Sequence, residues 1–250
     1  MGLLRKVEPE LLDQLRADDP RAIASRRDLK LFNAFAFHSG LMARGLIRHY
    51  GDDKPRALVD LGAGDGTFML GVARRLVSRW PNMKVILLDR QSIVSGDTRA
   101  AFAALGWKLE TVTADLFDFL ASIGPADVNI ITANLFLHHF TPQQLARLLG
   151  RVAQTARLFM ACDPRRTAWV REIARLSWAL GCNDVSVHDA VASARAGFNG
   201  QELSALWPKA ENWELHERAA GLFSHCFVAR RTAIGNAIAR AETRAMDQGR

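Results

Sequence analysis

The turn Gly62-Ala63-Gly64-Asp65-Gly66 constrains the fold of this chain more than any other part of its sequence. An apolar run, residues 56–59, leads through Asp60 and Leu61 into the turn, and an apolar helix-like segment follows at residues 68–77. Glycines at alternate positions let the backbone turn sharply and leave no side chain between it and a ligand. The sequence therefore predicts a strand, a tight turn and a helix, with a ligand site at the turn. A turn that binds no ligand is the alternative.

The glycine spacing distinguishes this turn from the dinucleotide-binding fingerprint, in which the third glycine would fall at Thr67. The segment from Val59 to Thr67 instead resembles the first motif of class I S-adenosylmethionine-dependent methyltransferases. In that family the loop cradles the methionine half of the cofactor. The resemblance implies that four residues of this turn bind S-adenosylmethionine: Asp60, Gly62, Ala63 and Gly64.

Apolar strand-like runs and helical segments alternate along most of the chain. Such alternation predicts an α/β fold with a doubly wound, mostly parallel sheet. The last two strand-like runs are joined by a short segment containing Gly221, and a gap that short allows only an antiparallel hairpin. This topology resembles that of class I methyltransferases, so we expect a seven-stranded sheet with an antiparallel last strand. The expected strands are residues 56–60, 84–89, 109–113, 126–133, 158–162, 213–218 and 222–229.

The sequence divides into an expected core and three flanking or inserted parts. Residues 56–230 form the expected methyltransferase core, and residues 231–250 have the character of a basic helical tail. Residues 1–55 are expected to form an N-terminal helical cap, because apolar and arginine residues recur there at helical spacing. Residues 167–208, with a helix near 169–180, form an insertion between the fifth and sixth strands. The resemblance implies that the cap and the insertion shape the substrate pocket, whereas packing on the edge of the sheet is the alternative for the cap.

Asp89 and Arg90 follow the second expected strand, at the edge of the sheet where ligands bind in open α/β folds. The two oxygens of a carboxylate match the two adjacent hydroxyl groups of a ribose. Asp89 lies one βα unit after the glycine turn and is therefore the expected ribose-binding residue. The resemblance places Arg90 beside the same part of the cofactor.

The ends of the third and fourth strands supply further candidate cofactor residues. Asp115 and Leu116 resemble the family position at which a carboxylate accepts a hydrogen bond from the adenine amino group and the next backbone N–H meets the ring. A helix N-cap is the alternative role of Asp115. Asn134 and Leu135 lie where family members bring backbone carbonyl groups close to the amino-acid end of the cofactor.

His138 and His139 are the candidate catalytic residues, since they lie between the fourth strand and a helix that Thr141 is expected to cap. A phenol, with an ordinary pKa near about 10, must lose its proton when it accepts a methyl group. One of the two histidines could remove that proton or orient the acceptor. A structural pair, with one ring bonded to the backbone, is the alternative. His38 and His188 lie in the two expected lid segments and are weaker candidates.

The fifth expected strand ends in Asp163-Pro164-Arg165-Arg166. The two arginines could bind an acidic substrate, because a guanidinium group pairs well with a carboxylate. A salt-bridged turn without a ligand is the favoured alternative.

The segment from Asn134 to Phe140 separates classes of methyl acceptor. Methyltransferases that act on amino groups of nucleic-acid bases typically carry an Asn/Asp-Pro-Pro-aromatic signature here, and protein-arginine methyltransferases carry a loop with paired glutamates. This chain has neither, and its Asn-Leu-Phe-Leu-His-His-Phe sequence resembles bacterial methyltransferases of small-molecule pathways. The resemblance implies methyl transfer to an oxygen or carbon nucleophile of a small, aromatic or polyketide-like molecule. An RNA methyltransferase and a catalytically inactive binding protein with the same fold are the alternatives.

Composition narrows the expected partners and the expected compartment. The net charge of +7 comes mostly from arginines scattered along the chain, which favours a solvated surface over a nucleic-acid-binding face. The cysteines, Cys162, Cys182 and Cys226, match no metal or redox spacing, so we expect no metal site and a reducing cytoplasm. No apolar run is long enough to cross a bilayer. A homodimer is compatible with these features.

Overall fold

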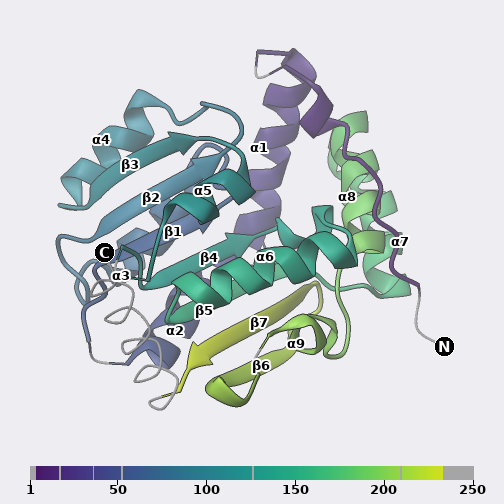
Figure 1. The fold of residues 1–250 in the computed structure, drawn as a ribbon. Coiled ribbons are helices and arrows are strands. Elements are labelled where there is room, and N and C mark those ends of the chain that lie inside the picture. Colours follow the sequence, from purple (N-terminus) through teal and green to yellow (C-terminus); the bar gives the residue numbers. More distant parts are fainter. Residues whose placement is uncertain are drawn as a thin grey trace.

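The computed structural model describes residues 4–232, except residues 17, 36, 52, 126 and 209. Most of the expected basic tail, residues 233–250, therefore lies outside the described residues. A seven-stranded sheet forms the centre of the molecule, and helices cover both of its faces (Figure 1). This α/β architecture with a mixed sheet confirms the fold that the sequence predicts.

The strands lie in the order β3-β2-β1-β4-β5-β7-β6. The first five pair in parallel, whereas β7 runs antiparallel to both β5 and β6. The predicted antiparallel hairpin at the end of the chain is thus confirmed, and its second strand is the one inserted beside β5. The strands are β1 (Ala57–Leu61), β2 (Lys84–Asp89), β3 (Lys108–Thr113), β4 (Ile130–Asn134), β5 (Leu158–Pro164), β6 (Trp213–Ala220) and β7 (Ser224–Arg231).

The fourth strand begins later than its apolar pattern indicates, at Ile130. Asn129, just before it, bonds outside a regular ladder, because its side-chain oxygen accepts a hydrogen bond from the backbone N–H of Arg56 at 2.6 Å. The backbone carbonyl of Asn129 also accepts from both Arg157 and Leu158 at the start of β5. A polar residue that joins three segments therefore precedes the strand.

Both faces of the sheet are buried under helices, which explains why the central strands are apolar almost throughout. Leu58 and Ile130 face one core, with α2 (His38–Tyr50), α3 (Thr67–Leu76) and α4 (Gly96–Ala104). Val59, Leu61 and Ile131 face the other core, with α5 (Leu116–Ser122), α6 (Pro142–Thr155) and α9 (Glu202–Leu206). Each fully buried leucine contributes about 1.5–3 kcal/mol to folding. Within the described residues, every helix is too short or too polar to span a lipid bilayer.

The carboxyl edge of the parallel strands is covered by helices from the N-terminal region and from the insertion between β5 and β6. These are α1 (Pro20–Phe35), α7 (Ala168–Leu176) and α8 (Asp184–Ala196), with the short 3-10 helices η1 (Leu12–Gln14) and η3 (Ser177–Leu180). The N-terminal segment runs along α8, as Figure 1 shows. The carboxylate of Asp189 on α8 accepts hydrogen bonds from the backbone N–H groups of Leu11 and Leu12. The expected helix near 169–180 is divided, because α7 ends and a 3-10 turn completes it.

Candidate functional site

The predicted glycine turn lies between β1 and α3, and two of its glycines are required for different reasons. Gly62 has φ +67°, and a Cβ atom built on it would lie 2.2 Å from the ring of Phe136. Gly64 has φ +56°, but a Cβ atom there would meet no atom of the described residues within 4 Å. The backbone of Gly62 is therefore packed against protein, whereas that of Gly64 faces open space.

Asp89 and the glycine turn are joined directly. The backbone N–H of Gly64 donates to Oδ2 of Asp89 at 2.8 Å, and the N–H of Gln91 donates to Oδ1 at 2.9 Å. The side chain of Arg90 is exposed beside them. The structure thus brings together the two strand ends on which the sequence prediction depends most.

Asp60 and Ala63 lie beneath the open face of the turn. The Asp60 carboxyl group is 2% exposed and accepts a hydrogen bond from the hydroxyl of Thr132 at 2.7 Å. Burial raises the pKa of Asp60 to about 7. Ala63 is also buried, and its backbone N–H donates to the carbonyl of Leu88. Both residues support the turn from the side of the sheet.

The third and fourth strand ends differ in how their candidate residues are used. Asp115 is the N-cap of α5 and accepts hydrogen bonds from the N–H groups of Phe117 and Asp118. Leu116, next to it, packs into the core. Leu135 has the left-handed φ of +51°, a conformation that costs about 1–3 kcal/mol and tends to occur at functional sites.

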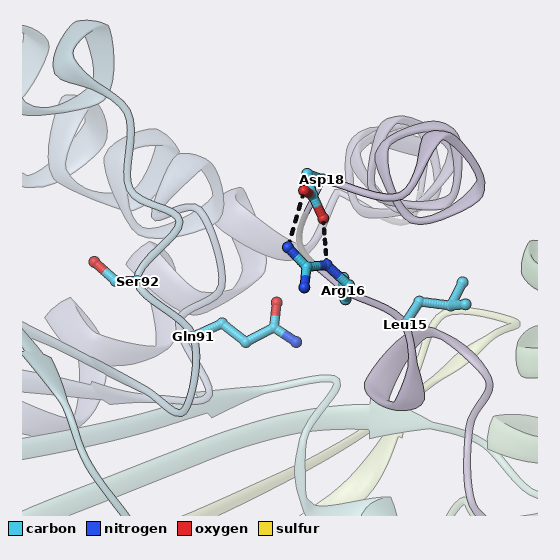
Figure 2. A pocket seen from close by; sticks show the side chains of 5 residues that line it. All are labelled: Leu15, Arg16, Asp18, Gln91 and Ser92. Carbon is cyan, nitrogen blue, oxygen red and sulfur yellow. Dashed lines mark hydrogen bonds and ion pairs between the residues drawn. The ribbon is translucent and has the colours of Figure 1, made fainter.

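A shallow cavity of about 510 Å³, largely open to solvent, lies next to Gln91, whose backbone N–H donates to Asp89. It lies between the loop after β2, which supplies Gln91 and Ser92, and the chain that leads into α1, as Figure 2 shows. On that second side, the guanidinium group of Arg16 donates two hydrogen bonds to the carboxylate of Asp18. The cavity is lined by Leu15, Arg16, Asp18, Gln91 and Ser92.

Helix α1 is fastened to the same edge by polar contacts. The Lys30 ammonium group lies 2.6 Å from a carboxylate oxygen of Asp65 in the glycine turn. The guanidinium group of Arg26 donates to the side-chain oxygen of Gln91 at 3.1 Å. The expected cap region therefore contacts both loops that border the cavity.

His138 lies in the 3-10 helix η2 (Leu137–His139) and is almost completely buried between two carboxylates. Its Nδ1 lies 2.8 Å from Oδ1 of Asp163 at the end of β5, and its Nε2 lies 3.1 Å from Oε1 of Glu10. Burial alone would lower the pKa of His138, but the hydrogen bonds to Asp163 and Glu10 raise it to about 9. The pKa of Glu10, which burial alone would raise, is lowered to about 2 by the same contact.

His139 packs against His138, with ring centroids 4.3 Å apart. Its Nε2 lies 3.9 Å from Oε2 of Glu10, and its Nδ1 lies 3.5 Å from Oδ2 of Asp13. Burial, followed by the charge of His138, lowers the pKa of His139. The two predicted histidines are therefore brought to one point, together with two acids of the N-terminal segment, residues 4–16.

The two weaker histidine candidates have structural partners. The Nε2 atom of His38 lies 2.6 Å from the hydroxyl of Ser224, and burial lowers the pKa of His38 to about 4. Asn134 also bonds to His38. His188 is half exposed and pairs with Asp189 at 2.9 Å.

The two arginines after β5 also bond within the protein. Arg166 forms an ion pair with Glu202, and the backbone N–H of Arg165 donates to the carbonyl of Phe223 at 2.7 Å. Arg166 therefore matches the alternative of a salt-bridged turn, whereas among the described residues the buried Nε of Arg165 has no hydrogen-bond partner.

Sequence reasoning missed the residues that surround His138. Asp163 accepts hydrogen bonds from the N–H groups of Phe136 and His138 as well as from the ring. Its place at a strand end, like that of Asp89, was the signal that could have identified it. Glu10 and Ser193, which bond to each other, lie in no motif. Only the folded chain brings them to the site.

Comparison with known proteins identifies relatives of this chain. The model of the O-methyltransferase domain matches residues 20–160. Strychnine O-methyltransferase of Strychnos nux-vomica is 32% identical over 123 residues, which are 48% of this chain and 30% of the relative. The chain thus spans about a third of the length of that relative.

Three solved structures have a similar fold. The plantazolicin methyltransferase BpumL, in complex with SAH, has a TM-score of 0.60 at 12% identity and covers 88% of this chain and 94% of its own. The mitomycin 7-O-methyltransferase MmcR has a TM-score of 0.57 at 19% identity, over 88% of this chain and 60% of that one. An O-methyltransferase family protein from Burkholderia thailandensis has a TM-score of 0.55 at 17% identity, over 87% and 63%. Since the domain model matches more than half of the sequence, this protein belongs to the O-methyltransferase domain family.

Proposed function

We propose that this protein transfers a methyl group from S-adenosylmethionine to an oxygen atom of a small molecule. The observation that carries the proposal is the hydrogen bond from the Gly64 backbone to Asp89, at a point where Gly64 faces open space. This hydrogen bond connects the turn, whose backbone a ligand can approach, with a carboxylate that can bind the hydroxyl groups of a ribose. The description of the family supports oxygen over carbon as the methyl acceptor.

The residues at this edge fit S-adenosylmethionine. A carboxylate offers about four acceptor positions, and Asp89 uses two of them for Gly64 and Gln91. Two acceptor positions are thus left for the ribose hydroxyls. The hollow beside Gln91, whose backbone N–H bonds to Asp89, leaves open space next to this carboxylate. Gly62 and Gly64 would lie along the methionine half, and the Leu116 backbone N–H would lie near the adenine.

Bound S-adenosylmethionine would supply an activated methyl group, and the protein would align the acceptor and exclude water. His138 is the proposed proton acceptor, in the neutral form that it would take once the acceptor replaces Glu10, because the Glu10 contact is one cause of its raised pKa. Asp163 holds its Nδ1, which leaves Nε2 as the atom directed toward an acceptor hydroxyl. Glu10 lies at that nitrogen in this structure. The acceptor would therefore replace the Glu10 contact when it binds.

The acceptor itself is proposed to be aromatic or polyketide-like. Phe136 packs against both His139 and Phe140, so that aromatic rings border the histidine pair. Such rings pack favourably against a flat apolar molecule. Strychnine O-methyltransferase and mitomycin 7-O-methyltransferase, among the relatives, are named for small molecules.

The remaining expectations are a reducing cytoplasm, a possible homodimer and no nucleic-acid partner. Cys162 and Cys226 are free thiols whose sulfur atoms lie 2.9 Å apart. A reducing compartment would keep such a pair as thiols. The size of the protein in solution tests the homodimer.

Calorimetry with S-adenosylmethionine and with its demethylated product tests the proposal. Both should bind with one site per chain, and the adenine nucleotide ATP should not compete. Absence of binding by either would contradict the proposed function. Tight binding of RNA that weakens steeply with salt would favour the RNA methyltransferase instead.

A further inference from the structure

Glu10, His138 and His139 converge although they come from two distant parts of the chain. Among the described residues, they form the one group of three or more histidine, cysteine or acidic side chains arranged to hold a metal ion, with one ligand atom from each and all within 4.8 Å. We propose that these three residues bind a divalent transition-metal ion such as Zn²⁺. The site goes beyond methyl transfer, and its existence does not depend on that activity.

The separations suit a zinc ion. Zinc bonds to imidazole nitrogen and carboxylate oxygen at about 2.0–2.2 Å, which places tetrahedral ligand atoms about 3.3 Å apart. Nε2 of His138 lies 3.1 Å from Oε1 of Glu10, and Nε2 of His139 lies 3.9 Å from Oε2. Small side-chain movements would therefore close all three ligands on one ion.

Each candidate ligand is oriented by a neighbour, as ligands of bound metals usually are. Metal-binding histidines commonly direct their second ring nitrogen at a carboxylate. His138 directs Nδ1 at Asp163, and His139 directs Nδ1 at Asp13. The hydroxyl of Ser193 bonds to Glu10. The Nε2 atoms of both rings are thus the ones turned toward the common point.

Charge and exposure also favour a cation. Three carboxylates, those of Glu10, Asp13 and Asp163, touch only two imidazole rings. The His139 side chain is 22% exposed and that of Glu10 is 12% exposed, whereas His138 is 3% exposed. An ion would therefore have a route from solvent and an open fourth position. Two imidazoles favour zinc, cobalt or nickel over calcium or magnesium, which prefer oxygen ligands.

A bound ion would connect two parts of the molecule that are 128 positions apart in sequence. It would fasten the N-terminal segment to η2 and occupy Nε2 of His138. If the proposed base role is right, the ion would then suppress methyl transfer, and this single consequence rests on the proposed function. Binding itself can be measured without cofactor or acceptor.

The test uses the full chain after treatment with a chelator. Zn²⁺ is titrated by calorimetry, and Co²⁺ is titrated by its visible absorption, which reports the coordination of the ion. The variants are His139→Ala and Glu10→Gln, neither of which removes a fully buried side chain. His49→Ala is the control, because His49 pairs with His216 at a ring distance of 4.8 Å without belonging to the site.

We expect one ion per wild-type chain and an unchanged affinity in His49→Ala. His139→Ala and Glu10→Gln should each weaken binding by more than about 10-fold, because even outer-shell changes cost about 10- to 100-fold. The cobalt spectrum should show nitrogen ligation that His139→Ala alters. Absence of binding, or equal losses in His49→Ala and His139→Ala, would overturn the proposal.

Discussion

The two halves of the strand edge are built in different ways. In the half formed by β1, β2 and β3, the glycine turn and Asp89 belong to successive βα units and meet through a backbone hydrogen bond. In the half formed by β4 and β5, His138 is held by Asp163 and Glu10, which are 25 and 128 positions away. The first half, which we call the cofactor half, depends on backbone geometry. The second, which we call the acceptor half, depends on buried charge.

This difference has an energetic consequence. A backbone turn tolerates changes that keep its dihedral angles and its space. A buried ion pair is less tolerant, because removal of one partner leaves an uncompensated charge. The acceptor half should therefore be the more fragile half in folding, and the cofactor half should be the more sensitive one in cofactor binding.

The largest expected effect is on stability in the acceptor half. Asp163→Ala removes a carboxylate that is 1% exposed and accepts three hydrogen bonds around His138. We expect a loss of about 3–5 kcal/mol in the free energy of unfolding, measured with urea. The matched change Asp115→Ala removes an exposed acid of the other half, which caps α5, and should cost about 1 kcal/mol of stability. Equal losses of stability in Asp163→Ala and Asp115→Ala would contradict the difference between the two halves.

A second pair of variants separates packing from ligand access within the glycine turn. Gly62→Ala forces a positive φ on alanine and drives its Cβ into the ring of Phe136, which should cost about 2–4 kcal/mol of stability. The Cβ of Gly64→Ala meets no atom within 4 Å in the described part of the chain, so this change should cost only about 1–2 kcal/mol. Its Cβ would nevertheless occupy the space proposed for the cofactor. Thermal unfolding and calorimetry together check the pair, and a Gly64→Ala protein that binds S-adenosylmethionine normally would contradict the assignment.

A third prediction concerns the affinity of the cofactor half. Asp89→Ala should weaken binding of S-adenosylmethionine by about 2 kcal/mol, which is about 30-fold, since hydrogen bonds to a charged group are lost. Asp97→Ala is the control, because Asp97 is exposed in the first turn of α4. Calorimetry at one salt concentration measures both variants. An unchanged affinity in Asp89→Ala would show that the ribose lies elsewhere.

The same division explains how much the sequence could predict. The sheet, its antiparallel hairpin and the Gly64–Asp89 contact follow from local patterns, because strand ends of a parallel sheet meet at one edge. His138 was also found, since it follows β4 directly. Its partner Glu10 could not be predicted, because no periodicity or spacing connects residue 10 with a loop of the sheet. Asp163 could have been identified from its position at the end of a strand, but the sequence pattern assigned a chemical role only to the two arginines beside it.

Local pattern was also insufficient where one residue serves two roles. Asp115 matches both a cofactor position and a helix cap, and the structure contains the cap. The cap uses Oδ1 for both of its hydrogen bonds, so a role of the second oxygen at the adenine stays a prediction. The proposed metal site illustrates the opposite case, because its histidine and glutamate ligands come from distant segments and none of the cysteines belongs to it.

The smallest expected effect is a dependence of stability on pH, to which two buried groups, His38 and Asp60, contribute with opposite signs. His38, near the acceptor half, has its pKa lowered by burial to about 4. Between these two pKa values the unfolded chain is protonated at His38 and the folded protein is not. The free energy of unfolding therefore falls as the pH drops from about 6.5 toward about 4. Asp60, under the glycine turn, has its pKa raised by burial to about 7. The contribution of Asp60 to the free energy of unfolding is fully present at low pH and is lost as the pH rises from about 4 to about 7.

Urea unfolding of wild type and of His38→Gln separates these two contributions. Between about pH 7 and about pH 5.5, protonation of His38 in the unfolded chain should reduce stability by about 1 kcal/mol. The variant lacks this titration but keeps a polar group that can reach Ser224, so its stability should fall less, or rise, over the same interval. Asp60→Asn should change the slope in the opposite direction, because it removes a carboxyl group whose ionisation opposes folding. Parallel pH profiles in wild type and His38→Gln would show that His38 is not held neutral in the folded protein, which would contradict the prediction.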